Sequence, residues 1–178
     1  MAVRPNVEPI WQEATFQSEG LDARALITRT DLKGIITFAS LAYRKMTKYP
    51  KPELLGKPHS VVRHPFMPEV AFKGMWEIIK KGEHWEGMVM NLRKDGKHYW
   101  VIVPIEPIDQ KGDFESDPQK IVQYVAVRKE PDRKQVKETF ELYKQMRLEE
   151  LKLKTHLKDW EQKLLKKLTS LKFEDISV

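Results

Sequence analysis

Two residues with complementary binding chemistry, Trp85 and Asn91, stand six positions apart in the run HWEGMVMNLRK. We expect this apolar run, which is bounded by turn-forming residues, to be a strand. An even spacing places both side chains on one face of a sheet. There an indole can stack on a flat ligand and an amide can hydrogen-bond to it. For Trp85 the alternative is ordinary core packing, and the same alternative applies to Trp76.

Arg63 and His64, in the run VVRHPFMP, are a second pair with binding chemistry. A guanidinium suits a phosphate group, because its fork of donors matches the phosphate oxygens. The alternative is structural. In that case Arg63 forms a salt bridge and His64 hydrogen-bonds a neighbouring backbone group, which orders the turn before Pro65. Taken alone, these residues favour the structural alternative.

The sequence contains little that supports catalysis or metal binding. It has no cysteine, which removes disulfides, thiolate nucleophiles and thiolate metal ligands. Its five histidines show no HExxH or paired ligand spacing, so we expect no metal site. There is no GxGxxG motif, no phosphate-binding loop and no evident acid–base pair. We therefore expect that the protein is not an enzyme.

Length and composition indicate a globular protein with one core. The 178 residues suffice for one domain and an appendage, and 40% of them are hydrophobic. No apolar stretch is long enough to span a membrane and the N-terminus lacks the apolar core of a secretion signal, so we expect a cytoplasmic protein. The net charge is +6, but basic and acidic residues interleave along the chain. This pattern favours a solvated surface over a nucleic-acid interface.

The patterning also predicts the elements that position these residues. Residues 1–24 show no sustained period and are expected to form an N-terminal arm or cap. The run ALITRTDLKGIITFAS predicts a β-hairpin with Gly34 at the positive φ of its turn. Ser40 is expected to cap a short helix, and a longer helix is predicted over residues 68–81. Three consecutive antiparallel strands should follow, in HWEGMVMNLRK, HYWVIVPIEPI and IVQYVAVRK.

The C-terminal part, residues 131–178, has a different composition. Beyond Pro131 the chain has no Gly or Pro and is rich in Lys, Glu and Leu, which predicts one continuous helix toward Leu171. A heptad counted from Val136 is imperfect but indicates an amphipathic or coiled-coil signalling helix. We favour contact with another protein, including a homodimer through this helix. The alternative, which periodicity leaves open, is a helix folded back on its own domain.

The runs LLGKPHSVVRHPFMPEVAFKGMW and KKGEHWEGMVMNLRKDGKHYWV closely resemble the PAS sensor domain of bacterial aerotaxis receptors. The resemblance covers about residues 28–129. It joins a Gly-x-Pro-His turn, an Arg-His-Pro element, a Trp-containing helix and an Asn-x-Arg-Lys strand. It implies that residues 25–130 form an α+β PAS fold, a five-stranded antiparallel sheet with short helices on one face, followed by a long C-terminal helix.

The resemblance also implies noncovalent binding of FAD, whose oxidation state would follow the respiratory chain and be relayed to a chemotaxis signalling domain. The chain is similar to the soluble sensor half of a bipartite energy-taxis system, in which a separate transducer carries the anchor. It would then reach the membrane only through that partner, without inserting directly. The alternatives are a PAS interaction or dimerisation module with another ligand, such as haem on His64, or with no cofactor.

By this resemblance the cofactor-binding residues are Arg63, His64, Trp85, Asn91, Ser40 and Trp76. Two positions depart from the family: Phe66 stands where members usually carry Asp, and Ser40 where they usually carry Asn. Both positions are linked to the cofactor in the family, so the polarity of the pocket is expected to differ. A redox signal would leave Asn91 through Tyr124 and Arg128 on the last strand and enter the long helix.

Overall fold

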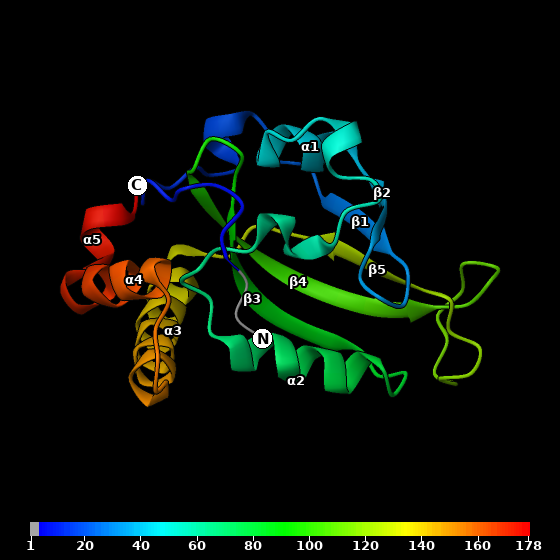
Figure 1. Cartoon of the computed structure of the whole chain (residues 1–178). Helices are drawn as coiled ribbons and strands as arrows, with labels where there is room; N and C mark the ends of the chain where they lie inside the picture. The colour runs from blue at the N-terminus through cyan, green and yellow to red at the C-terminus, as the bar shows by residue number, and fades with distance from the viewer. Residues whose placement is uncertain (1–3) are drawn as a thin grey trace.

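The computed structural model describes residues 4–178 and confirms the α+β fold. Its five strands form one antiparallel sheet in the order β2-β1-β5-β4-β3 (Figure 1). The strands are β1 (Leu26–Thr30), β2 (Ile36–Ala39), β3 (Trp85–Leu92), β4 (His98–Ile108) and β5 (Gln123–Arg128). Helices α1 (Leu41–Thr47) and α2 (Glu69–Ile79) are joined by short 3-10 turns, which include η3 (His59–Val62). Within residues 4–178 no helix combines the length and apolarity that a membrane crossing requires.

The β1–β2 turn follows the prediction made from its residues. The Asp31 carboxylate accepts hydrogen bonds from the N–H groups of Lys33 (2.8 Å) and Ile35 (2.9 Å). Gly34 has a φ of +85°, which L side chains rarely adopt. A Cβ atom on Gly34 would also lie 3.0 Å from the Trp76 ring. The turn therefore packs closely against α2.

The predicted starts of both helices are confirmed. The Ser40 hydroxyl accepts from the N–H of Tyr43 (3.2 Å) at the start of α1 and from the N–H of Ile27 (3.1 Å) in β1. This cap joins the helix to the sheet. Helix α2 begins after Pro68 and ends shortly before Gly82, whose φ is +85°.

The N-terminal arm packs on the beginning of β4. The N–H of Ala14 donates to the carbonyl of His98 (2.8 Å), and Phe16 is buried in the core. The Glu13 carboxylate accepts two hydrogen bonds from Arg133, at 2.7 and 2.8 Å. The arm is thereby joined to the start of the C-terminal helices.

The long C-terminal helix is confirmed as α3 (Arg133–Leu153), but its continuation toward Leu171 is wrong. The chain leaves the helix at residues 154–158 and continues as α4 (Asp159–Ser170) and α5 (Phe173–Ile176). Glu161 caps the new helix, because its carboxylate accepts the N–H of Lys158 (3.1 Å). Residues 154–158 have a helical composition. The cap and the burial of the apolar face of α4 nevertheless favour a break between α3 and α4 over one continuous helix.

The C-terminal helices fold back on the core of the domain (Figure 1). Val136, Leu164 and Leu171, which occupy one position of the predicted heptad, are buried in the same hydrophobic cluster as the sheet. The alternative of a helix folded back on its own domain is therefore the one that the structure shows. These heptad positions already have partners within the chain, so the prediction of a continuous coiled coil is wrong. The homodimer stays a prediction.

Candidate functional site

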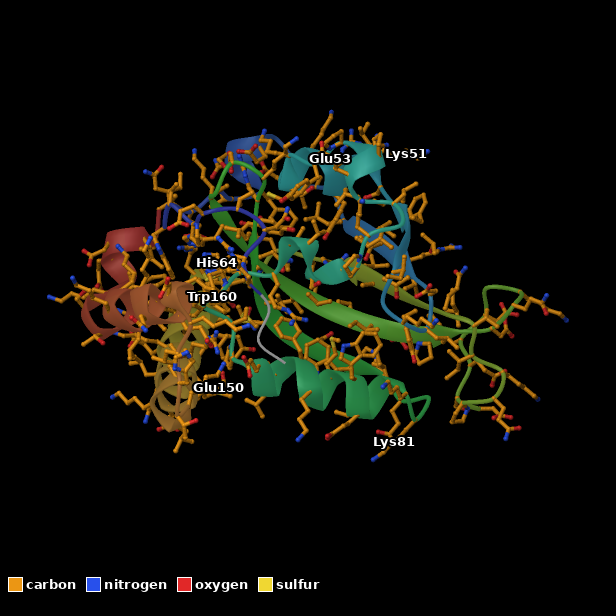
Figure 2. The ribbon with its side chains drawn as sticks, viewed as in Figure 1. Lys51, Glu53, His64, Lys81, Glu150 and Trp160 are labelled. Carbon is orange, nitrogen blue, oxygen red and sulfur yellow. The ribbon has the colours of Figure 1, made fainter. Side chains whose placement is uncertain are left out.

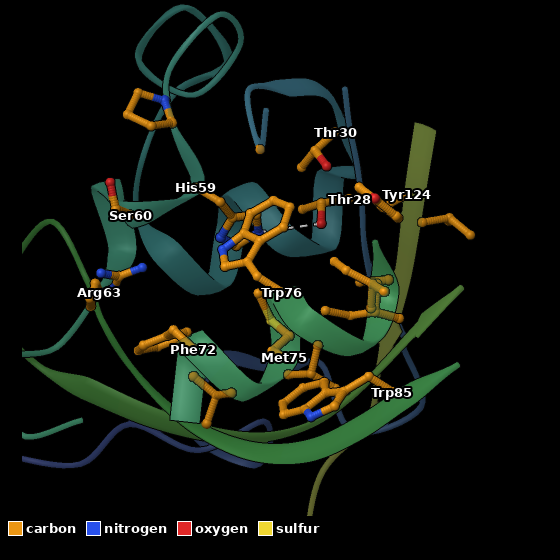
Figure 3. A pocket seen from close by; sticks show the side chains of 18 of the residues that line it. Thr28, Thr30, His59, Ser60, Arg63, Phe72, Met75, Trp76, Trp85 and Tyr124 are labelled. Atoms are coloured by element: carbon orange, nitrogen blue, oxygen red, sulfur yellow. Dashed lines mark hydrogen bonds between the residues drawn. The ribbon is translucent and has the colours of Figure 1, made fainter. Parts of the chain in front are cut away.

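A cavity of about 230 Å³ lies between the inner face of the sheet, α2 and residues 58–63. Figure 3 shows Phe72 and Trp76 of α2 facing the same space as Trp85 of β3. Most of its wall is apolar, with a few polar side chains among the lining residues, as is common for small-molecule sites. The interior between sheet and helix is thus open to a ligand.

Of the six predicted cofactor-binding residues, four line this cavity: Arg63, Trp76, Trp85 and Asn91. Ser40 and His64 are not among its lining residues. The hydroxyl of Ser40 caps α1 instead. The ring of His64 is fully buried between Trp11 and His98, with ring centroids 4.8 and 5.9 Å away.

The structural alternative describes His64 correctly. Its Nδ1 accepts the N–H of Phe66 (3.0 Å), which orders the turn around Pro65. Burial lowers the pKa of His64 well below its ordinary value, so the imidazole is neutral. Haem ligation through His64 does not fit the structure, because this ring lies outside the cavity.

The β3 wall provides both the stacking surface and the amide. Gly87 stands two residues after Trp85, on the same face of the strand, and a Cβ atom there would lie 2.4 Å from the Trp85 ring. Glycine therefore allows the indole to lie against the strand. Asn91 is buried, and its Nδ2 donates to the hydroxyl of Tyr99 (3.4 Å). Backbone pairing of Arg63 with Asn91 brings the predicted phosphate-binding residue to this wall.

Arg63 lies at the side of the cavity with its guanidinium 4.1 Å from the centre of the Phe72 ring. Burial lowers the pKa of Arg63, and its Nε has no hydrogen-bond partner within the described residues. A buried donor without a partner is costly, and a ligand oxygen could satisfy it. The predicted salt bridge of the structural alternative is absent from residues 4–178, which leaves Arg63 available to an anionic group.

A second hollow, of about 430 Å³, adjoins the cavity along α2. It shares Arg63, Phe72 and Trp76 with the cavity. It adds two ammonium groups and two carboxylates, those of Lys73, Lys80, Glu69 and Glu77. The inner cavity is smaller than the roughly 300–1,000 Å³ typical of sites for drug-sized ligands, so it suits a flat ring system better than a whole dinucleotide. The residues fit FAD if its ring occupies the cavity and its phosphates meet Arg63 and the lysines of the outer hollow, where cationic side chains outnumber the carboxylates.

Sequence reasoning missed the polar inner wall formed by Thr28, His59 and Arg128. Arg128 was expected only to relay a signal. Its guanidinium donates to the Thr28 hydroxyl (2.9 Å) and contacts Nε2 of His59 (2.7 Å). Burial and the adjacent Arg128 lower the pKa of His59 to about 3. The signal that could have identified Arg128 is its even spacing from Tyr124, which also lines the cavity.

Phe66 does not alter the cavity, contrary to the expectation from its departure from the family. It is fully buried but is not a lining residue. Its ring stacks on Phe140 of α3, with centroids 5.2 Å apart and planes at 10°. It also meets Trp100 edge to face. The aromatic side chain therefore anchors α3 to the core.

The start of α2 is held by α3. The Glu150 carboxylate accepts the N–H groups of Glu69 (2.9 Å) and Val70 (3.0 Å), as a capping residue of α2 would. The buried Arg147 donates from Nε to the carbonyl of Pro65 (2.9 Å) and pairs with Glu150. Figure 2 places Glu150 where α3 meets the start of α2. The helix that lines the cavity is thus in direct contact with the C-terminal helices.

The family profile described as the PAS fold matches residues 36–117. The chain is 39% identical over 123 residues to the aerotaxis receptor of Escherichia coli K12, a match covering 69% of this chain and 23% of the receptor. It is 26% identical over 89 residues to the biofilm dispersion protein BdlA of Pseudomonas aeruginosa, covering 49% and 21%. The chain therefore spans less than a quarter of the length of these relatives.

Solved structures show the same fold. The light-state structure of the blue-light photoreceptor Aureochrome1 LOV superimposes with a TM-score of 0.54 at 22% identity, covering 72% of this chain and 93% of that one. A light-oxygen-voltage domain studied with a flavin analogue gives 0.55 at 21% identity, covering 71% and 92%. At such identities the likeness concerns the fold alone.

Proposed function

We propose that this chain, which carries a PAS domain of the aerotaxis receptor family, is a redox sensor. It binds FAD in the cavity beside α2. The observation that carries the proposal is the composition of that cavity. Trp85 offers a stacking surface, Asn91 an amide, and Arg63 a guanidinium with an unpartnered donor. The sensor would act in the cytoplasm and pass its state to a separate chemotaxis transducer.

The residues would divide the cofactor between the two hollows. The cavity residues Trp85, Phe72 and Asn91 would hold the flat ring, since aromatic side chains favour stacking and the amide fixes orientation. Arg63 and Lys73 would bind the phosphates at the outer hollow. The bound flavin would supply reversible electron uptake, with a change of charge on its ring.

Two routes lead from the cavity to the C-terminal helices. The first is the expected one: Tyr124 and Arg128 on β5 line the cavity, and this strand continues through Pro131 into α3. The second was not expected from the sequence. It runs along α2, whose N-terminus is bound by Glu150 of α3. A change in the hydrogen bonds of the cavity could shift either element and alter the docking of α3.

The experiment that tests FAD binding is an absorption spectrum of the purified, unheated protein. We expect the bands of oxidised flavin, their bleaching by dithionite, and FAD in the extract. Asn91→Ala and Trp85→Ala should lose the flavin. Ser40→Ala is the matched control, because Ser40 lies outside the cavity, and it should retain the flavin. A protein without flavin bands even after refolding with FAD would refute the proposal.

The relay is tested by hydrogen exchange of the flavin-loaded protein in the oxidised and the reduced state. The proposal predicts that exchange changes in the first turn of α2 and in α3 around Glu150. Helix α1 (Leu41–Thr47), which contributes no residue to the cavity lining, serves as an internal reference. Identical exchange in both states would show that reduction does not reach α3.

A further inference from the structure

The charged side chains of the cavity wall are all cationic. Four lining residues carry basic side chains, and none carries a carboxylate. The four are Lys33, His59, Arg63 and Arg128. Within the described part of the chain the wall is therefore electropositive, and Tyr124 is the one lining residue with an acidic hydroxyl.

Arg128 is the most deeply buried charge of this wall, with 3% of its surface exposed. Its guanidinium contacts Thr28 and His59 and lies 4.9 Å from the centre of the Tyr43 ring. None of these three groups is an anion. No ion pair within residues 4–178 includes Arg128, and its Nε has no hydrogen-bond partner there.

His59 does not compensate this charge. It is neutral near pH 7, because burial and the adjacent guanidinium lower its pKa. A neutral ring can accept from Arg128 but supplies no negative charge. Buried charges in proteins are ordinarily paired, because an isolated one is costly to desolvate. The missing counter-charge is thus expected from whatever fills the cavity.

Arg63 and Lys33 are less suited to this role. Arg63 also lines the outer hollow and reaches that side of α2. Lys33 is exposed in the β1–β2 turn. Arg128 alone combines burial, an unpartnered donor and a place on the sheet. Any charge preference of the inner wall should depend on this residue.

We infer that Arg128 makes the cavity selective for a planar ligand with an anionic edge directed at β1 and β5. For a flavin, which rests on the proposed function, the same cation favours the form with more negative charge. Uptake of two electrons and one proton adds one net negative charge to a neutral flavin ring. Arg128 would thereby stabilise the reduced protein relative to the oxidised one and raise its reduction potential.

The first arm of the test uses the flavin-free protein and two planar probes of similar shape, anionic benzoate and neutral benzamide. Thermal unfolding should show that benzoate stabilises the wild-type protein more than benzamide. Arg128→Gln should lose at least tenfold in benzoate affinity, and Arg128→Lys should retain most of it. Arg29→Gln is the matched control, because Arg29 precedes Thr30 on β1 but is exposed and lines no cavity.

The second arm uses the FAD-loaded protein, with dithionite as the electron donor and a reference dye to measure the midpoint potential. Loss of the cation should lower the affinity for reduced FAD relative to the affinity for oxidised FAD by about tenfold to a hundredfold. That ratio corresponds to a midpoint about 30 to 60 mV lower in Arg128→Gln. Arg128→Lys and Arg29→Gln should stay near the wild type.

The outcomes separate this inference from the proposed function. Equal stabilisation by benzoate and benzamide, or a benzoate preference that survives in Arg128→Gln, would overturn the inference. So would an unchanged midpoint in a variant that still binds FAD. Absence of FAD binding with an intact benzoate preference would refute the proposed function alone. If Arg128→Gln does not fold, Thr28→Val removes the hydroxyl that holds the guanidinium and should weaken benzoate binding in the same direction.

Discussion

The contact between Glu150 and the start of α2 can be tested by a single substitution, Glu150→Gln. The carboxylate accepts two backbone N–H groups, at 2.9 and 3.0 Å, and pairs with the buried Arg147 at 3.2 Å. The amide keeps the shape of the side chain and one acceptor oxygen. It loses the negative charge and the acceptor for the second N–H, so both the cap and the ion pair are weakened.

The expected magnitude follows from these contacts. Hydrogen bonds to charged groups contribute about 1.5–3 kcal/mol and neutral ones about 0.5–1.5 kcal/mol, so the exchange costs about 1 kcal/mol. Loss of a negative charge at a helix N-terminus costs up to about 1 kcal/mol more. The total of about 2 kcal/mol corresponds to a decrease in Tm of roughly 4–8 °C for a chain of this length.

The assay is thermal and urea unfolding of Glu150→Gln beside Glu149→Gln. The control removes the same charge from the neighbouring residue, which is exposed on α3. We expect the control to lie within about 0.5 kcal/mol of the wild type, as surface substitutions usually do. If both variants unfold alike, Glu150 does not cap α2, and the route from the cavity through α2 to α3 loses its main support.

Three further predictions concern the cavity and the docking of α3. Gly87→Ala should displace the Trp85 indole and weaken FAD binding at least tenfold in a fluorescence titration. In the control Gly74→Ala an added Cβ meets nothing within 4 Å, so this variant should bind FAD normally and gain about 0.5–1 kcal/mol of stability. Equal affinities of the two variants for FAD would contradict the prediction. The pKa of His59 is about 3 in the folded protein and near 6.5 in the unfolded chain. Between these two values only the unfolded chain takes up the proton. The free energy of unfolding therefore decreases as the pH falls below 6.5, by at most about 1.4 kcal/mol per pH unit. Urea unfolding at pH 7 and pH 5 should therefore show about 2 kcal/mol less loss in His59→Gln than in the wild type, and parallel losses would show that His59 protonates freely in the folded state. Phe140→Ala should cost about 3–5 kcal/mol by calorimetry yet leave the affinity for FAD unchanged, and a matching loss of flavin would mean that α3 also shapes the cavity.

The parts of the fold that could be predicted are those determined by local contacts. The Asp31–Gly34 turn, the Ser40 cap and the bounds of α2 each depend on residues within a few positions of one another. The common face of Trp85 and Asn91 followed from the two-residue period of a strand. Of the six site residues that the resemblance implied, four line the cavity, and only the shared face of Trp85 and Asn91 could be predicted from local patterning.

The remaining features depend on contacts between distant segments. His64 lies against Trp11, and Phe66 lies against Phe140 of α3, so neither position could be inferred from neighbouring residues. The end of α3 is likewise fixed by packing of α4 on the core, which a helical composition does not reveal. The lack of a counter-charge at Arg128 likewise depends on distant segments, because Thr28, His59 and the other lining residues come from separate parts of the chain.

The measurement that tests the central claim most directly is a titration of refolded, flavin-free protein with FAD, followed by tryptophan fluorescence. Trp76 and Trp85 both line the cavity, so bound flavin should quench them. We predict saturable quenching at one FAD per chain, which Asn91→Ala weakens and Ser40→Ala leaves unchanged. Quenching that never saturates, or that is the same in Asn91→Ala as in the wild type, would contradict a flavin site in this cavity.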